Sequence, residues 1–327
     1  MTNKIRTAVV GLNMGLAHAY AFHESDRADL RWVVDLDETK AKSVAEELGC
    51  GYATDWTTIL DDIDAVSLCT PHHLHAPQAM QAIAAGKHVL VEKPLANSEE
   101  ECLRLIRAAA EQNVKLMVAY VMRYVPGIVR LKELLDSGAY GKPIHANCWI
   151  EGYLPPSPGS WFSRKDMLGG GVLFSHGCHY IDLMLVFFGK PDRVVSLGTH
   201  LGTEWMEGEG TSHATVRFEN GVLGHLGCSW GMRHAAPPAL FHIHTTEGLL
   251  ALSRDCLEIT AVTGKGTEMV YKGERNPQKS GNVIYEIEHF LASISEDREP
   301  QSSGRDALLS HRTIWAAYAA EGVKVEV

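Results

Sequence analysis

The sequence predicts an α/β fold in two parts, with a parallel sheet in residues 1–120 and a mostly antiparallel sheet in residues 121–327. Three observations support this prediction. Apolar β-rich runs alternate with helical patterns up to Tyr120, longer β-rich runs dominate after it, and 327 residues are enough for two hydrophobic cores.

In the first part, five short apolar runs are separated by helical patterns. These runs are residues 7–10, 30–34, 65–69, 88–91 and 116–119. The helix before the last run carries a start signal, because Ser98 and Glu101 are spaced so that each side chain can bind the backbone amide of the other. The alternation predicts parallel strands with helices on both faces of the sheet.

In the second part, Asn220-Gly221 marks a hairpin turn between two β-rich runs, which favours antiparallel pairing. Residues 154–160 are rich in Pro, Gly and Ser and indicate an exposed loop. Helical patterns cover residues 127–137, 172–188, 284–294 and 306–320.

Charge and composition restrict the class of partner. The formal net charge of −10 weighs against nucleic acid or an anionic membrane, so a small molecule is the expected ligand. The seven cysteines occur singly without a CxxC spacing, which favours a reduced, cytoplasmic setting. We find no secretory signal at the start and no apolar run of membrane-spanning length.

The turn after the first strand resembles a phosphate-binding turn. Gly11 would let backbone amides approach a pyrophosphate, and Asp35 ends the next strand, where it could accept from both ribose hydroxyls. The match to GxGxxG is imperfect, because Asn13 replaces the second glycine and Gly15 comes one residue early. An ordinary strand-turn-helix without a ligand is the alternative. The cofactor contacts that we predict here are Gly11, Leu12, Asn13, Met14 and Asp35, with NAD favoured over NADP because the carboxylate would repel a 2′-phosphate.

Glu92 and Lys93 end an apolar strand and are followed by Pro94. A carboxylate and an ammonium are costly to bury, so their place at the end of a strand indicates a cleft. Lys93 is therefore the first candidate for chemistry.

Several motifs together make the chain resemble the Gfo/Idh/MocA family of oxidoreductases, which includes glucose-fructose oxidoreductase and inositol dehydrogenase. The resemblance covers nearly the whole sequence. Its motifs are Thr-Pro-His-His-Leu-His at 70–75, Gly-Lys-His-Val-Leu-Val-Glu-Lys-Pro-Leu at 86–95, and Gly-Gly-Gly followed by His-x-x-Asp within 169–182, with weaker matches at 120–126, 137–141 and 285–290.

The resemblance implies an N-terminal doubly wound Rossmann domain and a C-terminal α/β domain with a large open sheet. It further implies a nicotinamide cofactor in the cleft between them and assembly into homodimers or homotetramers through that sheet. Members typically oxidise a ring hydroxyl of a sugar, inositol or related polyol, or reduce the ketone. By motif position, Lys93 and His179 correspond to catalytic residues, and the cofactor contacts include Gly11, Asp35, Thr70, Pro71, His75 and Glu92.

One position departs from the family pattern. Many polyol dehydrogenases of the family carry an aspartate four residues before the histidine, and Ser175 stands there in this sequence. A hydroxyl can bind a substrate oxygen but does not supply the negative charge. The residues that we predict to bind the substrate are Tyr120, Arg123, Trp161, Ser175 and His176.

The residue types suit alcohol oxidation. Imidazole titrates near neutrality, so His179 fits a general base, and Lys93 would polarise the substrate oxygen and stabilise developing alkoxide charge. Which of the two takes the proton stays open. Asp182, on the same helical face as His176 and His179, could orient one of these histidines.

Histidine-rich segments raise the alternative of a metal site. The trio His176, His179 and Asp182 and the cluster His72, His73 and His75 both contain metal-ligand residue types, but further ligands are not indicated and we predict no metal. We assign His72 and His75 to the edge of the cofactor site instead.

Three functions remain in competition. The first is an NAD-dependent dehydrogenase, the second is an NAD-requiring glycosidase-like enzyme that oxidises its substrate transiently, and the third is a non-catalytic sensor. Retention of Lys93 and His179 favours an enzyme, whereas Ser175 and the contracted glycine turn favour a sensor.

Overall fold

The structure, a computed structural model, describes residues 4–157, 159–234 and 239–322. These residues form two compact units. Of the described residues, those within 4–121 and 276–308 belong to the first unit, and those within 122–275 and 309–322 belong to the second.

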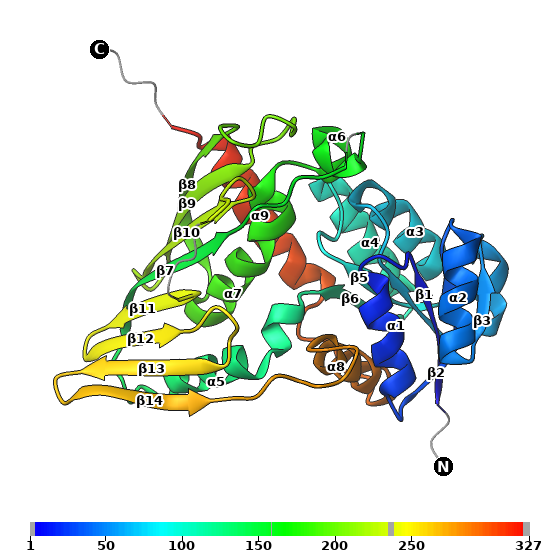
Figure 1. Cartoon of the computed structure of the whole chain (residues 1–327), viewed down its shortest axis with the longest axis horizontal. Helices are drawn as coiled ribbons and strands as arrows, with labels where there is room; N and C mark the ends of the chain where they lie inside the picture. Colours follow the sequence, from blue (N-terminus) through cyan, green and yellow to red (C-terminus); the bar gives the residue numbers. More distant parts are fainter. Residues whose placement is uncertain (1–3, 158, 235–238, 323–327) are drawn as a thin grey trace. The chain divides into compact units, whose positions relative to one another are not determined.

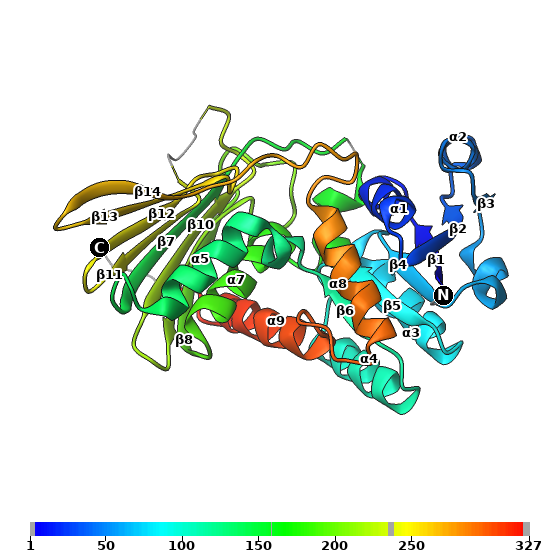
Figure 2. The same ribbon diagram turned by 90° about the horizontal axis from the view of Figure 1, so that it is seen from below.

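The first unit is built on a parallel sheet with strand order β3-β2-β1-β4-β5-β6 (Figure 1). Its strands are β1 (Ile5–Val10), β2 (Ala28–Val34), β3 (Gly51–Ala53), β4 (Ala65–Leu68), β5 (His88–Glu92) and β6 (Leu116–Ala119). Its helices are α1 (Gly15–Glu24), α2 (Glu38–Leu48), α3 (His72–Ala84), α4 (Glu99–Glu111) and α8 (Val283–Ser295). Figure 2 shows α1 and α8 over one face of the sheet and α3 and α4 over the other, so the predicted doubly wound arrangement is confirmed.

The five strands expected in this unit are present, and β3 is an addition. Strand β3 lies at the edge of the sheet beside β2. It has only three residues and is therefore too short to produce an apolar run in the sequence. One of the two predicted capping bonds is confirmed, since the amide of Glu101 donates to Ser98 Oγ at 3.3 Å. Ser98 Oγ in turn donates to Glu101 Oε2 at 2.9 Å, a bond between the two side chains.

Residues 276–308 belong to the first unit although they follow the second unit in sequence. The predicted division into residues 1–120 and 121–327 does not include this return of the chain. Helix α8 packs against α1, and the backbone near Ser302 pairs with β6. The amide of Val118 donates to the carbonyl of Ser302, and Ser302 Oγ donates to the carbonyl of Val118, each at 2.8 Å. These contacts bring a late part of the chain beside the parallel sheet.

The second unit contains an eight-stranded sheet of order β14-β13-β12-β11-β7-β10-β9-β8, in which β7 and β10 are parallel and the other neighbours antiparallel. Its strands are β7 (Pro143–Glu151), β8 (Pro191–Thr199), β9 (Thr211–Phe218), β10 (Leu223–Ser229), β11 (Phe241–Thr245), β12 (Gly248–Leu252), β13 (Glu258–Thr263) and β14 (Gly266–Lys272). Its helices include α5 (Pro126–Ser137), α6 (Lys165–Leu168), α7 (Cys178–Phe188) and most of α9 (Gly304–Ala319). The predicted large, mostly antiparallel sheet is confirmed.

Helices α5, α7 and α9 lie on one face of the eight-stranded sheet (Figure 2). Among the residues described, no helix covers the opposite face. The stretch Lys165–Phe188 is long and apolar enough to span a membrane by length and composition, but 83% of its most apolar window is buried inside the protein. Burial of this kind is typical of a helix that forms part of a protein core.

Candidate active site

The turn between β1 and α1 requires glycine at two positions. Gly11 has a φ of +88°, and a Cβ there would lie 2.6 Å from the carbonyl oxygen of Cys69. A Cβ at Gly15 would lie 2.8 Å from Val9 Cγ1, so this glycine lets α1 pack closely on the sheet. That is the role of the third glycine in a dinucleotide-binding turn, and Gly15 performs it from one residue earlier.

Asp35 closes this turn at the end of β2. Its Oδ2 accepts from the amide of Leu12 at 2.8 Å and from Lys40 Nζ at 3.1 Å, while Oδ1 accepts from the amide of Asp37 at 3.0 Å. Burial alone would raise the pKa of Asp35, but the two amides and Lys40 outweigh it and lower the pKa below its ordinary value. A carboxylate has about four acceptor positions. One remains for a ribose hydroxyl, and a second becomes available if Lys40 turns away.

Lys40 contacts two of the predicted cofactor residues, Asp35 and Asn13, and the sequence analysis did not propose it. Its Nζ also donates to Asn13 Oδ1 at 2.7 Å, so the residue at the second glycine position is tied to the turn through its side chain. Met14, also predicted as a cofactor contact, is 61% exposed, whereas Leu12 is buried. The signal for Lys40 was its place in the first turn of α2, close in sequence to Asp35.

Glu92 lies in a buried cluster of ionisable side chains in the first unit. Its Oε1 lies 3.3 Å from His18 Nε2, and its Oε2 accepts from the backbone amide of Lys93 at 3.1 Å. The same His18 nitrogen lies 3.9 Å from Glu286 Oε1, and His18 Nδ1 lies 2.9 Å from Ser67 Oγ. The carboxylate that precedes Lys93 is therefore held by α1 and approached by α8.

The ionisable side chains of His18, Glu92 and Glu286 shift one another's pKa. Burial raises the pKa of Glu286 to about 8, with the charge of His18 opposing and that of Glu92 adding to the rise. Burial would raise the pKa of Glu92 too, but its hydrogen bond to His18 lowers it. Burial would lower the pKa of His18, but Cys69 and the two carboxylates raise it well above its ordinary value. The sequence analysis did not find His18 or Glu286, because neither belongs to a recognisable motif.

His75 ties together the loops that follow β4 and β5. Its Nδ1 lies 2.7 Å from the carbonyl oxygen of Pro94, and its Nε2 lies 2.7 Å from that of Thr70. Thr70 Oγ1 donates to Gln78 Oε1 at 2.6 Å, and His72, like His75, is buried. Burial lowers the pKa of His75, although the two carbonyls favour its protonated form. His75 thus fixes the loop on which Pro71 lies and the position of Pro94 after Lys93.

In the second unit, two of the predicted substrate residues, Ser175 and His176, lie in a π-helical turn at the start of a helix. Leu173–Gly177 forms a π-helical turn that contains Ser175 and His176, and α7 continues from Cys178 with His179 in its first turn. The sequence predicted one continuous helix here. Such π turns are frequent at functional sites because they widen the helix and redirect side chains.

A row of aromatic rings extends from His176. Trp230 Nε1 donates to His176 Nδ1 at 3.2 Å, and the ring of Phe162 stacks on Trp230 with centroids 4.6 Å apart. Trp161 meets Phe162 edge to face at 5.4 Å, and the rings of His176 and His179 are 6.4 Å apart. Trp161 is therefore linked to His176 through Phe162 and Trp230, neither of which the sequence analysis proposed, and His176 contacts His179 directly.

Asp182 is bound by Arg123. The guanidinium donates from Nε to Oδ2 and from Nη2 to Oδ1, each at 2.6 Å. The sequence analysis assigned Arg123 to the substrate and gave Asp182 a histidine to orient. The observed pair joins the segment before α5 to α7.

Tyr120, a predicted substrate contact, follows β6 directly and is fully buried. Among the residues that the structure describes, no group of three or more His, Cys, Asp or Glu side chains is arranged to hold a metal ion. The candidate residues of the first unit thus lie on a turn and at strand ends. In the second unit, Ser175, His176 and His179 lie at the start of a helix.

Both parts of the chain match known families. Residues 5–120 match the oxidoreductase family with an NAD-binding Rossmann fold, and residues 128–251 match the Gfo/Idh/MocA C-terminal domain. A levoglucosan dehydrogenase from Pseudarthrobacter phenanthrenivorans is 30% identical over 82% of this chain and 80% of its own length. The chain belongs to the Gfo/Idh/MocA family of oxidoreductases.

Two further relatives have similar coverage. A 1,5-anhydro-D-fructose reductase from Ensifer adhaerens is 30% identical over 87% of this chain and 89% of its own length. The solved structure of a levoglucosan dehydrogenase with NADH and levoglucosan has a TM-score of 0.85 at 23% identity, covers 98% of both chains, and shows the shared fold. As a Gfo/Idh/MocA protein, this chain is an oxidoreductase whose N-terminal domain is an NAD-binding Rossmann domain, as the sequence predicted.

Proposed function

We propose that this protein transfers a hydride between NAD and a ring hydroxyl or ketone of a sugar, inositol or related polyol. The observation that carries the proposal is the similarity, over more than four fifths of the chain, to two relatives that are named for sugar derivatives as substrates. The family match fixes the class of enzyme, and the residues below support the substrate class.

The turn after β1 fits the cofactor. Gly11 has no side chain and a φ of +88°, so a pyrophosphate at the start of α1 can approach its backbone closely. Asp35 retains an acceptor position for a ribose hydroxyl, and its negative charge favours NAD over NADP. When bound, NAD supplies the hydride acceptor, and the residues of the chain bind and orient the substrate.

Trp230 sets the tautomer of His176. Because the indole N–H donates to Nδ1, this nitrogen is an acceptor, and the neutral ring carries its proton on Nε2. We assign to Nε2–H the role of donor to a substrate oxygen. Trp161 supplies an aromatic surface at the other end of the row, which suits the apolar face of a sugar ring.

We assign proton transfer to His179 and charge stabilisation to Lys93. An imidazole within reach of the reacting hydroxyl takes its proton as the hydride leaves, and an ammonium stabilises the developing alkoxide. The Glu92 carboxylate fixes the backbone amide of Lys93. Ser175, where family members often have an aspartate, supplies a neutral hydroxyl, so we expect a substrate that needs no negative charge there.

The test is NADH formation by the full-length protein with a panel of sugars, anhydro sugars and cyclitols. We expect NAD reduction with at least one member, and loss of it in Lys93→Met and His179→Gln while NAD still binds. If both variants retain the wild-type rate, the assignment of catalytic residues is wrong. Product release without net NADH would instead support transient oxidation, and NAD binding without turnover on any member would support a sensor.

The open face of the eight-stranded sheet supports an oligomer. Strand register places Val195 and Met269 on the face that the described helices leave uncovered, and Leu197 and Leu223 are exposed as well. We propose that a second copy covers this face, and a Leu197→Glu variant should then be smaller than wild type in analytical ultracentrifugation. The seven free cysteines support a cytoplasmic location.

A further inference from the structure

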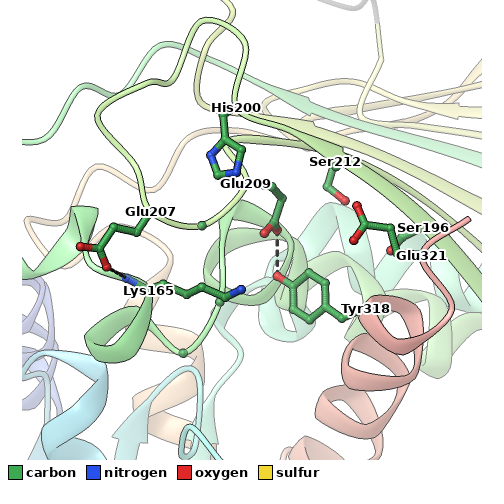
Figure 3. A pocket seen from close by; sticks show the side chains of 12 residues that line it. Lys165, Ser196, His200, Glu207, Glu209, Ser212, Tyr318 and Glu321 are labelled. Atoms are coloured by element: carbon green, nitrogen blue, oxygen red, sulfur yellow. Dashed lines mark hydrogen bonds between the residues drawn. The ribbon is translucent and has the colours of Figure 1, made fainter. Parts of the chain in front are cut away.

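A cavity of about 280 Å³ lies in the second unit. It is bounded by β8 and β9, the end of α9 and the residues that precede β9, and Figure 3 shows its polar side chains. The candidate substrate residues Ser175, His176 and His179 are not among the described residues that line it. It is therefore separate from the candidate active site.

One wall of the cavity is rigid. Tyr318 donates its hydroxyl to Glu209 Oε1 at 2.8 Å and accepts from the amides of Gly171 and Phe174, each at 3.2 Å. Glu209 Oε1 also accepts from the amide of Leu173 at 3.2 Å. Glu209 is thus fixed by α9 and by the start of the π turn, and its carboxylate does not need a ligand to be held in place.

Ser212 gives the cavity an unsatisfied polar group. Its side chain is 1% exposed and lines the cavity, and among the described residues its Oγ has no hydrogen-bond partner. The neighbouring Ser196 differs, because its Oγ donates to the carbonyl of Ala317 at 3.0 Å. Since buried hydroxyls normally have partners, Ser212 Oγ points to a molecule that occupies the cavity.

The charge of the lining defines the chemistry of that molecule. The carboxylates of Glu207, Glu209 and Glu321 line the cavity together with the ammonium of Lys165 and the imidazole of His200. Glu207 Oε2 also accepts from the backbone amide of Lys165 at 3.0 Å. None of these carboxylates forms an ion pair with another described residue. The lining is therefore negative and rich in acceptors, which favours a cation with several hydrogen-bond donors.

We propose that this cavity binds a small hydroxylated organic cation of the amino-sugar class. Its ammonium group is bound by the carboxylates of Glu209 and Glu321, and a hydroxyl group satisfies Ser212 Oγ. Burial raises the pKa of Glu209, and a nearby ammonium would favour its ionised form.

The test is calorimetric titration of the full-length protein with D-glucosamine, with D-glucose as the uncharged match. We expect glucosamine to bind more tightly than glucose, and Glu321→Gln and Ser212→Ala each to weaken glucosamine by about tenfold. Glu299→Gln, which removes the same charge from an exposed position outside the cavity, should leave the affinity unchanged.

A Lys93→Met variant distinguishes this cavity from the active site. Glucosamine affinity should be the same in this variant as in wild type, even if turnover is lost. Absence of glucosamine binding, equal affinities in wild type, Glu321→Gln and Ser212→Ala, or loss of binding in Lys93→Met would each overturn the proposal. None of these results depends on whether the protein oxidises a sugar.

Discussion

Arg123 and Asp182 form a bidentate ion pair in which both hydrogen bonds measure 2.6 Å. The side chain of Asp182 is fully buried and that of Arg123 is 10% exposed. Two charges removed from water in this way are stable only together, because either one alone would keep its desolvation cost without the compensating attraction.

Arg123→Met should therefore destabilise the protein by about 3–5 kcal/mol, because it removes the ion-pair partner of the buried Asp182 carboxylate. The double variant Arg123→Met with Asp182→Leu should recover most of this loss, since it removes both charges. Denaturant unfolding of the two single variants and the double variant measures the coupling. A single variant within about 0.5 kcal/mol of wild type would show that the pair contributes little.

Glu286 should make stability fall as the pH rises. Its pKa is raised from 4.5 to about 8 in the folded protein, so between these values the unfolded chain releases the proton while the folded protein keeps it. The folded state is therefore favoured most at low pH, and this advantage is lost through that window. Glu286→Gln, which resembles the protonated acid, should raise the melting temperature more at a pH of about 8 than at about 5.

The control for this prediction is Glu288→Gln on the same helix, where the side chain is 40% exposed and pairs with Arg27. This variant removes a carboxylate from the same helix at a partly exposed position and so controls for the loss of a glutamate from α8. Equal changes in melting temperature for Glu286→Gln at both pH values would mean that Glu286 is ionised throughout.

Features encoded by neighbouring residues were predictable from the sequence. The Ser98 and Glu101 cap and the Asn220-Gly221 hairpin depend on short-range spacing, and both occur in the structure. The family motifs led to Lys93 and His179 because their residues are contiguous. Contacts between distant segments were not predictable, because no local pattern records them.

Three such contacts shape the candidate site. Arg123 and Asp182 are 59 residues apart, and Trp230 and His176 are 54 residues apart. Glu286 reaches His18 only because the chain returns to the first unit after β14. The π turn was also missed, since its side-chain spacing follows from packing of Leu173–Gly177 and not from helical periodicity.

Asp35 and Lys40 should together set the cofactor preference. Asp35→Ala removes the ribose acceptor and should weaken NAD by about tenfold while affecting NADP less. Lys40→Met frees an acceptor position on Asp35 and removes a cation near the adenosine ribose. This variant should therefore increase the ratio of NADH affinity to NADPH affinity. Fluorescence titration with NADH and NADPH measures both ratios. An unchanged ratio in Asp35→Ala would remove Asp35 from the ribose site.

Gly11 and Gly49 offer a matched pair for the cofactor turn. Both have positive φ, +88° and +69°, so alanine at either position carries a backbone cost of about 1–2 kcal/mol. They differ in space, because a Cβ at Gly49 meets nothing within 4 Å, whereas one at Gly11 lies 2.6 Å from the Cys69 carbonyl oxygen. Gly49→Ala should be less stable than wild type by only this backbone cost and should bind NADH with the wild-type affinity.

Gly11→Ala should lose more stability than Gly49→Ala and should also bind NADH more weakly, because the turn must move away from β4 to admit the methyl group. Thermal unfolding and NADH titration of the two variants separate the backbone cost from the steric one. Gly11→Ala and Gly49→Ala could instead have the same melting temperature and the same affinity for NADH. The turn would then accommodate the methyl group without a change in NADH binding, and the close approach of Gly11 to Cys69 would not be required for NAD binding.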